Sequence, residues 1–445
     1  MTPLDRRSFV GGIAAAGAVA AMPRALHALG DAPAQPNQKL RVACIGVGGM
    51  GFNDVRGMAD EQLVAFADVD WNSAARAFRT WPNARRYKDF REMLEKEANN
   101  IDAVTVSTPD HVHGAAAMMA LKMGKHVYCQ KPLARTIGEV RALKAEAARR
   151  PRQATQMGNQ GHTAEGIRLI REWVEAGLIG PVRRVEYWTN RPIWPQAINR
   201  STQAHNVPET LDWNLWLGPA AARPYHPSYA PFNWRGWLDF GTGAMGDMAC
   251  HLMDAAYWTL GLKYPSKIIP ESTLLYNETF PAAERITYEF PAIGNRPAVT
   301  LTWRDGSIFP PAPEGWPTDQ DWPFDREGGQ VWIGDKGMIL AGTYGENPRL
   351  LDPKVAAEVE ARPVPQKYPR TRGVYQEFIT ACKTGGQGGS DFAGYAGPMT
   401  EMILIGVLAV RMGRTLEMNP DTGAITNLTP PSELVMPTFR SGWSL

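Results

Sequence analysis

The chain has 445 residues, 44% hydrophobic and 21% charged, so it is long enough for two or three domains and too apolar for a disordered protein. Its formal net charge is only +2, which argues against a nucleic-acid partner or an anionic membrane surface. The sequence contains neither a C-x-x-C pair nor an H-E-x-x-H motif, so we expect no zinc ribbon, disulfide framework or bound metal.

The first 37 residues have the features of an export signal followed by a linker. Arg6 and Arg7 precede an apolar run rich in Ala and Gly, from Val10 to Met22. This run is too short to span a bilayer, and paired arginines before such a run are typical of a twin-arginine signal; a simple N-terminal helix is the alternative. We expect the twin-arginine translocase to export the protein to the periplasm or beyond, with no membrane span in the mature chain.

A nucleotide-binding turn is predicted directly after the linker. An apolar strand, Leu40–Ile45, runs into a G-x-G-x-x-G pattern. In a Rossmann fold these glycines form a tight turn, let the backbone approach a diphosphate and let the following helix pack on the strand. The expected dinucleotide contacts in this turn are Gly46, Gly48, Gly49, Met50 and Gly51.

The choice between NAD and NADP depends on the next strand. This strand, residues 63–67, ends in Asp68, about 20 residues after the glycines, where the Rossmann pattern places an acid. A carboxylate there accepts a hydrogen bond from a ribose 2′-hydroxyl and disfavours a 2′-phosphate. NAD is therefore the predicted cofactor and NADP the less favoured one, with Asp70 as the alternative acid.

Strands and helices alternate over about 120 residues, which predicts a doubly wound parallel sheet. Ligands bind at the carboxyl ends of such strands, where Thr108 and Lys131 fall in addition to Gly46 and Asp68. The first domain is thus predicted as a Rossmann domain at 38–155. Its further strands are expected at 103–107 and 126–129, and its helices at 72–81, 88–98, 113–123 and 136–149.

Residues 156–445 follow a different pattern. A helix is expected at 163–176 and a strand at 182–189, and glycine-containing turn signals separate several short strands that come later. This half is predicted as an α+β domain with a mainly antiparallel sheet. Its later elements are strands at 267–269, 285–290, 298–303, 330–333 and 338–341 and helices at 373–384 and 397–412.

Tryptophan is concentrated in one part of this second half. Seven of the 15 tryptophans lie between Trp188 and Trp258. Core packing and a surface that stacks on sugar rings explain such a cluster equally well. A Pro-rich loop, residues 310–323, is expected to border the same site.

The motif G-T-G-A-M-G-D-M-A-C-H-L-M-D, residues 241–254, leads from a glycine-rich turn into a helix. Asp247 and His251 are four residues apart and share one helix face, with Asp254 nearby. A carboxylate one turn from an imidazole raises its basicity and holds its orientation, as a general acid–base requires. A capped helix with a polar face is the alternative. Two interpretations of Lys131 also remain open: a solvated lysine, and a hydrogen-bond donor to a substrate hydroxyl.

Four segments in this order resemble the Gfo/Idh/MocA oxidoreductase family. They are the G-V-G-G-M-G turn, S-T-P-D-H-V-H at 107–113, C-Q-K-P-L at 129–133 and the motif at 241–254. The resemblance covers about residues 39–440. It implies a Rossmann domain, an α/β domain with a large open sheet, and an active site between them. It also implies NAD(P), a sugar or polyol substrate and a homo-oligomer.

The resemblance also assigns roles to residues. Lys131, Asp247 and His251 would form the catalytic group: His251 would take the proton of the substrate hydroxyl while hydride passes to the nicotinamide, and Lys131 would polarise the reacting oxygen. Asp247 would orient His251 or bind a substrate hydroxyl. The further nucleotide contacts that it implies are Thr108, Pro109, His113, Gln130 and Asn159.

Two departures from the family pattern concern the site. Gln130 stands where the family usually has Glu before Lys-Pro, which leaves open the partner of Lys131. The turn G-N-Q-G-H, residues 158–162, replaces an Arg-containing turn. His162 is therefore expected to act as an added acid–base or as a substrate ligand, with Trp234 as a second substrate contact.

Export constrains the function, because no free NAD pool is expected outside the cytoplasm. The cofactor has to stay bound and be regenerated on the enzyme. The leading hypothesis is an oxidoreductase acting on a hydroxyl of a sugar, glycoside or polyol. A glycoside hydrolase or lyase that oxidises a ring carbon transiently is the alternative, and a non-catalytic NAD- or sugar-binding protein is the third.

Overall fold

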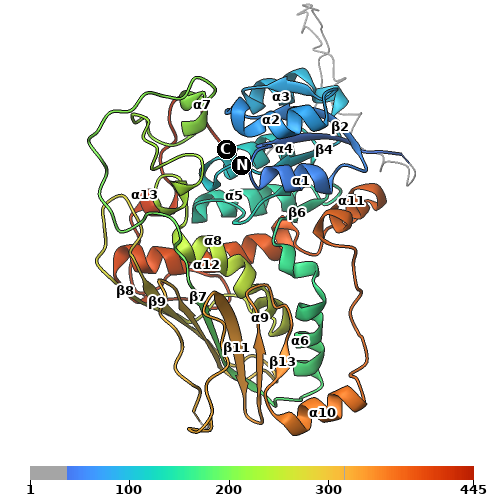
Figure 1. Ribbon diagram of the computed structural model, residues 1–445, viewed down its shortest axis with the longest axis vertical. Coiled ribbons are helices and arrows are strands. Elements are labelled where there is room, and N and C mark those ends of the chain that lie inside the picture. The colour runs from blue at the N-terminus through green and yellow to red at the C-terminus, as the bar shows by residue number, and fades with distance from the viewer. Residues whose placement is uncertain (1–37, 315) are drawn as a thin grey trace, which may run out of the picture. The chain divides into compact units, whose positions relative to one another are not determined.

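The computed structural model describes residues 38–314 and 316–445. The export signal expected at 1–37 lies outside the described residues. Figure 1 shows two sheets in the described chain, one in the blue and teal N-terminal half and one in the green to orange second half.

The first sheet has six parallel strands in the order β3-β2-β1-β4-β5-β6. This is the strand order of a Rossmann fold, so the predicted doubly wound parallel sheet is confirmed. The sheet extends to Met157, two residues beyond the boundary expected at 155. The strands are β1 (Arg41–Ile45), β2 (Gln62–Ala67), β3 (Arg85–Tyr87), β4 (Ala103–Val106), β5 (His126–Cys129) and β6 (Thr155–Met157).

Helices cover both faces of this sheet, which is why its central strands are almost wholly apolar. Every residue of β4 is buried, as are four of the five residues of β1. One covering helix, α11 (Val374–Thr384), comes from the end of the chain and packs Phe378 against Tyr128 of β5. The other helices are α1 (Gly51–Gly57), α2 (Trp71–Thr80), α3 (Phe90–Lys96), α4 (Asp110–Lys122) and α5 (Ile137–Ala148).

The second sheet has eight strands in the order β13-β12-β11-β7-β10-β9-β8-β14. Every neighbouring pair is antiparallel except β7 and β10, which confirms the mainly antiparallel sheet. The strands are β7 (Val182–Thr189), β8 (Lys267–Ser272), β9 (Glu284–Phe290), β10 (Val299–Arg304), β11 (Gly328–Gly334), β12 (Met338–Ala341), β13 (Arg349–Leu350) and β14 (Leu416–Glu417).

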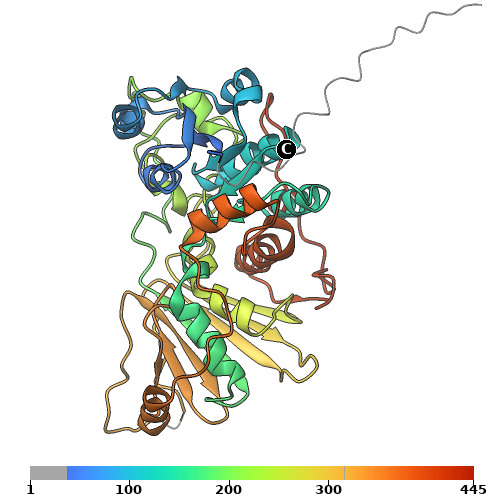
Figure 2. The ribbon, with the colours of Figure 1, turned by 90° about the vertical axis from the view of Figure 1, so that its right-hand side faces the viewer.

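Helices of the second half pack on one face of this sheet. In Figure 2 the red helix α12 (Gly397–Met412) lies between α5 and the strands, with which it shares a hydrophobic core. With the preceding turn, Phe392–Met412 is long and apolar enough to span a membrane, but 78% of its most apolar window is buried in the protein. The other helices are α6 (Glu165–Glu175), α7 (Trp213–Leu217), α8 (Gly243–Leu252), α9 (Asp254–Thr259), α10 (Pro353–Ala361) and α13 (Ser432–Val435).

The Pro-rich loop covers the opposite face of the second sheet, where the sequence did not place it. Successive strand residues point to opposite faces: Tyr187 of β7 joins the core under the helices, whereas Trp188 packs with Trp322 and Phe324. The indole N–H of Trp188 also donates to the Asp325 carbonyl at 2.6 Å. None of the described residues of 310–323 lines the cavity at the strand ends, so the expectation that this loop borders the site is wrong.

Candidate active site

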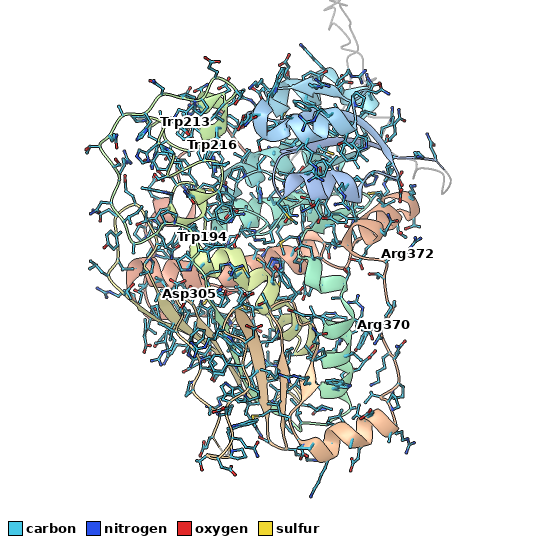
Figure 3. All side chains as sticks on the ribbon, in the orientation of Figure 1. Trp194, Trp213, Trp216, Asp305, Arg370 and Arg372 are labelled. Carbon is cyan, nitrogen blue, oxygen red and sulfur yellow. The ribbon has the colours of Figure 1, made fainter. Side chains whose placement is uncertain are left out.

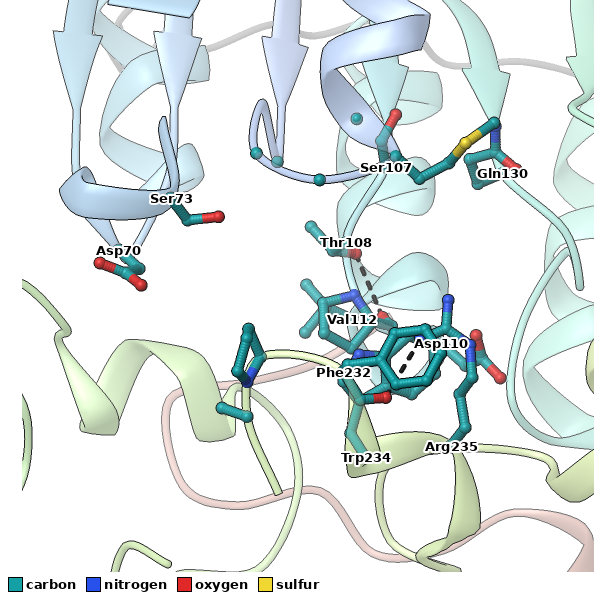
Figure 4. Close-up of a pocket in the computed structure, with 18 of the residues that line it drawn as sticks. Asp70, Ser73, Ser107, Thr108, Asp110, Val112, Gln130, Phe232, Trp234 and Arg235 are labelled. Atoms are coloured by element: carbon teal, nitrogen blue, oxygen red, sulfur yellow. Dashed lines mark hydrogen bonds between the residues drawn. The ribbon is translucent and has the colours of Figure 1, made fainter. Parts of the chain in front are cut away.

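A cavity of about 790 Å³ opens at the carboxyl ends of β1, β2, β4 and β5. One wall comes from the Rossmann half, beginning with the glycine turn at 46–51. The facing wall comes from residues 191–235, from α8 and from Tyr344. Figure 4 shows Phe232, Trp234 and Arg235 gathered on one side of this cavity and Ser73 on the other. The site therefore lies between the two halves.

The glycine turn has the shape that a dinucleotide diphosphate requires. A Cβ on Gly51 would lie 2.1 Å from the Gly46 carbonyl oxygen, and a Cβ on Gly48 would lie 2.0 Å from the Ser73 hydroxyl. Gly49 has φ +52°, and no atom lies within 4 Å of its ideal Cβ position. The turn is thus packed tightly on the protein side and open on the cavity side, which fits NAD.

Asp68 lines the cavity and also holds the glycine turn. Its Oδ2 accepts hydrogen bonds from the N–H groups of Val47 (2.9 Å) and Gly48 (3.2 Å), and its Oδ1 accepts one from Asp70 N–H (2.9 Å). Burial raises the pKa of Asp68, while these hydrogen bonds oppose the shift. Asp70 caps α2 with Oδ1, so both predicted acids lie at the expected end of β2.

His113 lies behind the cavity wall, whereas Thr108 and Pro109 line the cavity. The His113 ring is buried between two carbonyl oxygens: Nδ1 is 2.8 Å from Pro132 O and Nε2 is 2.9 Å from Thr108 O. Burial lowers the pKa of His113 to about 4, although the contacts with the two carbonyl oxygens oppose the shift. The ring joins the end of β4 to the Lys131–Pro132 segment rather than facing the cavity.

Lys131 and Asp247 meet at the floor of the cavity. Lys131 Nζ donates to Asp247 Oδ1 at 2.8 Å and to its carbonyl oxygen at 2.9 Å. Arg235 Nε donates to the same Oδ1 at 3.2 Å. Burial alone would raise the pKa of Asp247, but the Lys131 and Arg235 cations lower it to about 2. Asp247 is therefore a carboxylate under all ordinary conditions.

His251 follows one turn later on α8 and also lines the cavity. Its ring packs edge-on against Tyr344, with the ring centroids 4.7 Å apart. Its buried Nδ1 has no partner among the described residues, and no hydrogen bond joins it to Asp247 within them. Burial and the charge of Lys131 lower the pKa of His251 to about 3. The ring is thus a neutral imidazole, and Asp247 is bonded to Lys131 and Arg235 rather than to His251.

The Gln at position 130, where the family usually has Glu, pairs with a carboxylate on another element. Its Nε2 donates to both oxygens of Asp54 on α1, at 2.8 and 3.0 Å. Ser107 Oγ (2.6 Å) and Tyr375 OH (2.8 Å) donate to the same carboxylate. Burial raises the pKa of Asp54 to about 6, and a glutamate at position 130 would add a second acid to this cluster. The carboxylate of the cluster therefore belongs to α1, and Lys131 has Asp247 as its partner.

Asn159 and His162 form a buried cluster around Asp254 instead of lining the cavity. Asn159 Nδ2 donates to Asp254 Oδ2, and His162 Nδ1 lies 2.9 Å from Asp254 Oδ1. Tyr395 OH donates to the same Oδ1 at 2.5 Å. Burial disfavours the charged form of His162, but the Asp254 carboxylate raises its pKa above the usual value. Gln160 of this turn lines the cavity, whereas Asn159 and His162 do not.

Two cavity residues, Asp110 and Arg235, were missed by sequence reasoning. Asp110 is buried at the start of α4 and accepts a hydrogen bond from Thr242 Oγ1 at 2.8 Å. Burial and the neighbouring Asp247 raise the pKa of Asp110 to about 7. The signal for Asp110 was its place in the S-T-P-D-H-V-H segment, directly after a strand. Arg235 had no signal beyond its place among the tryptophans.

Some tryptophans of the cluster pack in a core, as one of the two interpretations expected, and some line the cavity. Trp213 and Trp216, which lie close together in Figure 3, stack with centroids 4.7 Å apart. They pack in a core that also includes Trp237. Trp194, Trp216 and Trp234 line the cavity. The Arg235 guanidinium lies over the Trp234 ring, 4.3 Å from its centroid.

Residues 208–216 of the second half cross over to the end of β2; we call them the strap. Leu211 forms a β-bridge with Asp70, and Asp212 N–H donates to Val69 O at 2.9 Å. Thr210 Oγ1 donates to Asp70 Oδ1 at 2.8 Å, and Lys88 Nζ donates to the Thr210 carbonyl at 2.5 Å. The strap thus closes the cavity at the end where Asp68 and Asp70 lie, the two acids predicted to bind the ribose of NAD.

Comparison with known proteins agrees with this architecture. A model of an oxidoreductase family with an NAD-binding Rossmann fold matches residues 40–158, and the model of the family's C-terminal α/β domain matches residues 166–294. Levoglucosan dehydrogenase of Pseudarthrobacter phenanthrenivorans is 26% identical over 196 residues, 44% of this chain and 42% of that protein. Inositol 2-dehydrogenase of Burkholderia multivorans is 32% identical over 147 residues, 32% of this chain and 43% of that protein. The matched segments thus span less than half the length of these relatives.

Solved structures share the fold over most of the chain. The WlbA dehydrogenase from Bordetella pertussis, in complex with NADH and UDP-GlcNAcA, has a TM-score of 0.60 at 16% identity, covering 86% of this chain and 98% of that one. Levoglucosan dehydrogenase in complex with NADH has a TM-score of 0.56 at 19% identity, covering 85% and 99%. Because the two family models together match more than half of the residues, the chain belongs to the Gfo/Idh/MocA oxidoreductase family.

Proposed function

We propose that this protein is an exported, NAD-dependent oxidoreductase that removes hydride from a hydroxyl-bearing carbon of a sugar, glycoside or polyol. The observation that carries the proposal is the placement of Lys131, Asp247 and His251 in one cavity, opposite a glycine turn that fits NAD. Levoglucosan and inositol dehydrogenases among the relatives support the substrate class. NAD would be held by the turn at 46–51, by Asp68 and by Thr108, and it would supply the hydride acceptor.

The three side chains have complementary tasks in this reaction. The neutral imidazole of His251 accepts the hydroxyl proton. An ammonium group has three donors, and Lys131 uses two of them on Asp247, so the third polarises the reacting oxygen. Asp247 Oδ2 accepts no hydrogen bond from the described residues and binds a second substrate hydroxyl.

Tight cofactor retention is part of the proposal because of the expected export. A twin-arginine system moves proteins already folded, so NAD bound in the cytoplasm would leave with the chain. The hydrogen bonds of the strap to Val69, Asp70 and Lys88 support retention. We propose that the bound cofactor is regenerated on the enzyme by a second, reducible sugar. A homo-oligomer remains a prediction.

The first experiment identifies the nucleotide that stays bound to the protein during purification. The chain from residue 38 is expressed, desalted and denatured, and the released nucleotide is identified by mass spectrometry. We expect about one NAD(H) per chain. NADP(H) would contradict the assignment of the acids at the end of β2, and a nucleotide-free protein would contradict retention.

The second experiment tests chemistry on the bound cofactor. A panel of sugars, glycosides and polyols is screened for reduction of bound NAD at 340 nm. Lys131→Ala and His251→Ala should abolish reduction, while Lys354→Ala, on exposed α10, serves as the matched control. Full activity in both site variants would overturn the proposal.

Export is tested separately: a reporter carrying residues 1–37 should lose export when Arg6 and Arg7 are replaced by Lys.

A further inference from the structure

The rim of the cavity differs in chemistry from its floor. The floor carries the charged groups of Lys131, Asp247 and Arg235 together with the imidazole of His251. At the rim, large apolar side chains remain exposed to solvent. The exposed fractions are 61% for Ile193, 43% for Phe232 and 41% for Tyr344.

These rim residues come from three separate segments, so the apolar rim is not a property of one loop. Ile193 follows β7, Phe232 precedes α8 and Tyr344 lies between β12 and β13. Figure 4 shows Phe232 projecting over the cavity next to Trp234 and Arg235. The Phe232 ring also packs edge-on against Trp194, with the centroids 6.1 Å apart.

A free sugar or cyclic polyol carries hydroxyls around its whole ring, so it matches the floor but not the rim. A hydroxyl desolvated against Ile193 or Phe232 would lose hydrogen bonds without a replacement. An aryl or alkyl group in the same place would gain from being removed from water. The cavity therefore favours a ligand that is polar at one end and apolar at the other.

We propose that the substrate is a glycoside with an apolar aglycone: the sugar lies on the floor, against Trp234, and the aglycone lies on the rim formed by Ile193, Phe232 and Tyr344. This inference rests on the proposed function and narrows its substrate class. Lys131 and Asp247 bind the hydroxyls of the sugar. The aglycone contributes affinity and takes no part in hydride transfer.

The test compares matched substrates on the NAD-loaded protein. For several hexoses in both anomeric forms, the free sugar, the methyl glycoside and the phenyl glycoside are each mixed with the protein, and reduction of bound NAD is followed at 340 nm. For the sugar that is oxidised, the phenyl glycoside should exceed the methyl glycoside in second-order rate constant by about 10- to 50-fold. Equal rate constants would overturn the inference.

Variants locate the preference. Ile193→Ser and Phe232→Ser should each lower the phenyl-to-methyl ratio to within about threefold of unity, and Phe232→Leu should retain most of it, because an apolar side chain remains. Ile293→Ser is the matched control, since Ile293 is 49% exposed and does not line the cavity. An unchanged ratio in both Ser variants would overturn the inference, whether or not their oligomeric mass changes. If no sugar derivative reduces the cofactor, the proposed function fails as well; if free sugars and methyl glycosides do so without preference, only the inference fails.

Discussion

Lys131 and Asp247 form an ion pair that joins the two halves of the molecule, with Nζ 2.8 Å from Oδ1 although the residues are 116 positions apart. Their side chains are only 14% and 9% exposed, so the pair lies in a largely desolvated place. Lys131 follows β5 of the Rossmann half and Asp247 lies on α8. The pair therefore links the strand ends of the Rossmann half to the cavity wall that α8 forms.

Replacing Lys131 by Met should remove both the pairing and the donor to the reacting oxygen. We expect reduction of bound NAD to slow by about 100-fold or more, as for other lost donors to a developing charge. The unfolding free energy should fall by about 1–3 kcal/mol, because the buried Asp247 carboxylate loses the nearer of its two cationic partners among the described residues. Single-turnover absorbance and urea denaturation measure the two effects. Lys354→Met, on exposed α10, should change neither.

Asp110 should control the pH dependence of hydroxyl oxidation. Its pKa of about 7 means that it is protonated below this pH and charged above it. The added negative charge stabilises the protonated product form of His251, so the rate should rise as the pH increases through 7. Asp110→Asn should remove this rise. Single-turnover rates between pH 5.5 and 8.5 provide the measurement, and an identical profile in the variant would contradict the role.

The Asp54–Gln130 contact predicts a compensating pair of substitutions. Gln130→Glu places a second buried acid against Asp54 and should lower the unfolding free energy by about 1–3 kcal/mol at pH 7. Asp54→Asn in the same chain should restore most of that loss, because the amide and the carboxyl have then exchanged places. Urea denaturation of the four proteins of the double-mutant cycle gives the interaction energy. Additive losses would show that the two side chains do not interact.

The strap should slow the release of NAD. Thr210→Val removes the hydrogen bond to Asp70, and Lys88→Met removes those to Val69 and to the Thr210 carbonyl. Together these changes should increase the dissociation rate of NAD by about 10-fold, as expected for roughly 1.4 kcal/mol of lost closure energy. The rate is measured by chasing bound NAD with a labelled excess. Lys96→Met serves as the control, since Lys96 pairs with Glu92 within α3, away from the strap.

His111 should make the fold sensitive to mild acid. This α4 residue is buried between Trp216 and Phe240, and its Nε2 lies 2.9 Å from the Trp216 carbonyl. Burial lowers the pKa of His111 to about 3, from an ordinary value of 6.5. Between these values the unfolded chain binds a proton that the folded chain does not, so stability falls as the pH decreases below 6.5.

His111→Gln should remove this contribution. Between pH 6 and pH 4, the unfolding free energy should fall less steeply with decreasing pH in the variant than in the original protein. The difference in slope should be about 1.4 kcal/mol per pH unit. Urea denaturation at several pH values measures the two slopes. Parallel slopes would show that His111 takes up its proton equally in both states.

The local parts of the fold and of the site could be predicted from the sequence. The strand–turn–helix at 40–57 depends on glycines whose roles are fixed by neighbours within a few residues, and the shared face of Asp247 and His251 follows from helical spacing alone. The strands β3 and β6 could not be predicted because each has three residues, too few to show a period.

Only the tertiary structure decided which of these groups meet. Periodicity relates residues that lie within a turn or two of each other, whereas the partners of Lys131, Asp54 and Asp254 come from segments distant in the chain. Asp254, three positions after His251, therefore pairs with His162 and not with Asp247 or His251 on α8. The Pro-rich loop was misplaced for the same reason: alternation along β7 gives each side chain a face, but packing alone decides what covers that face.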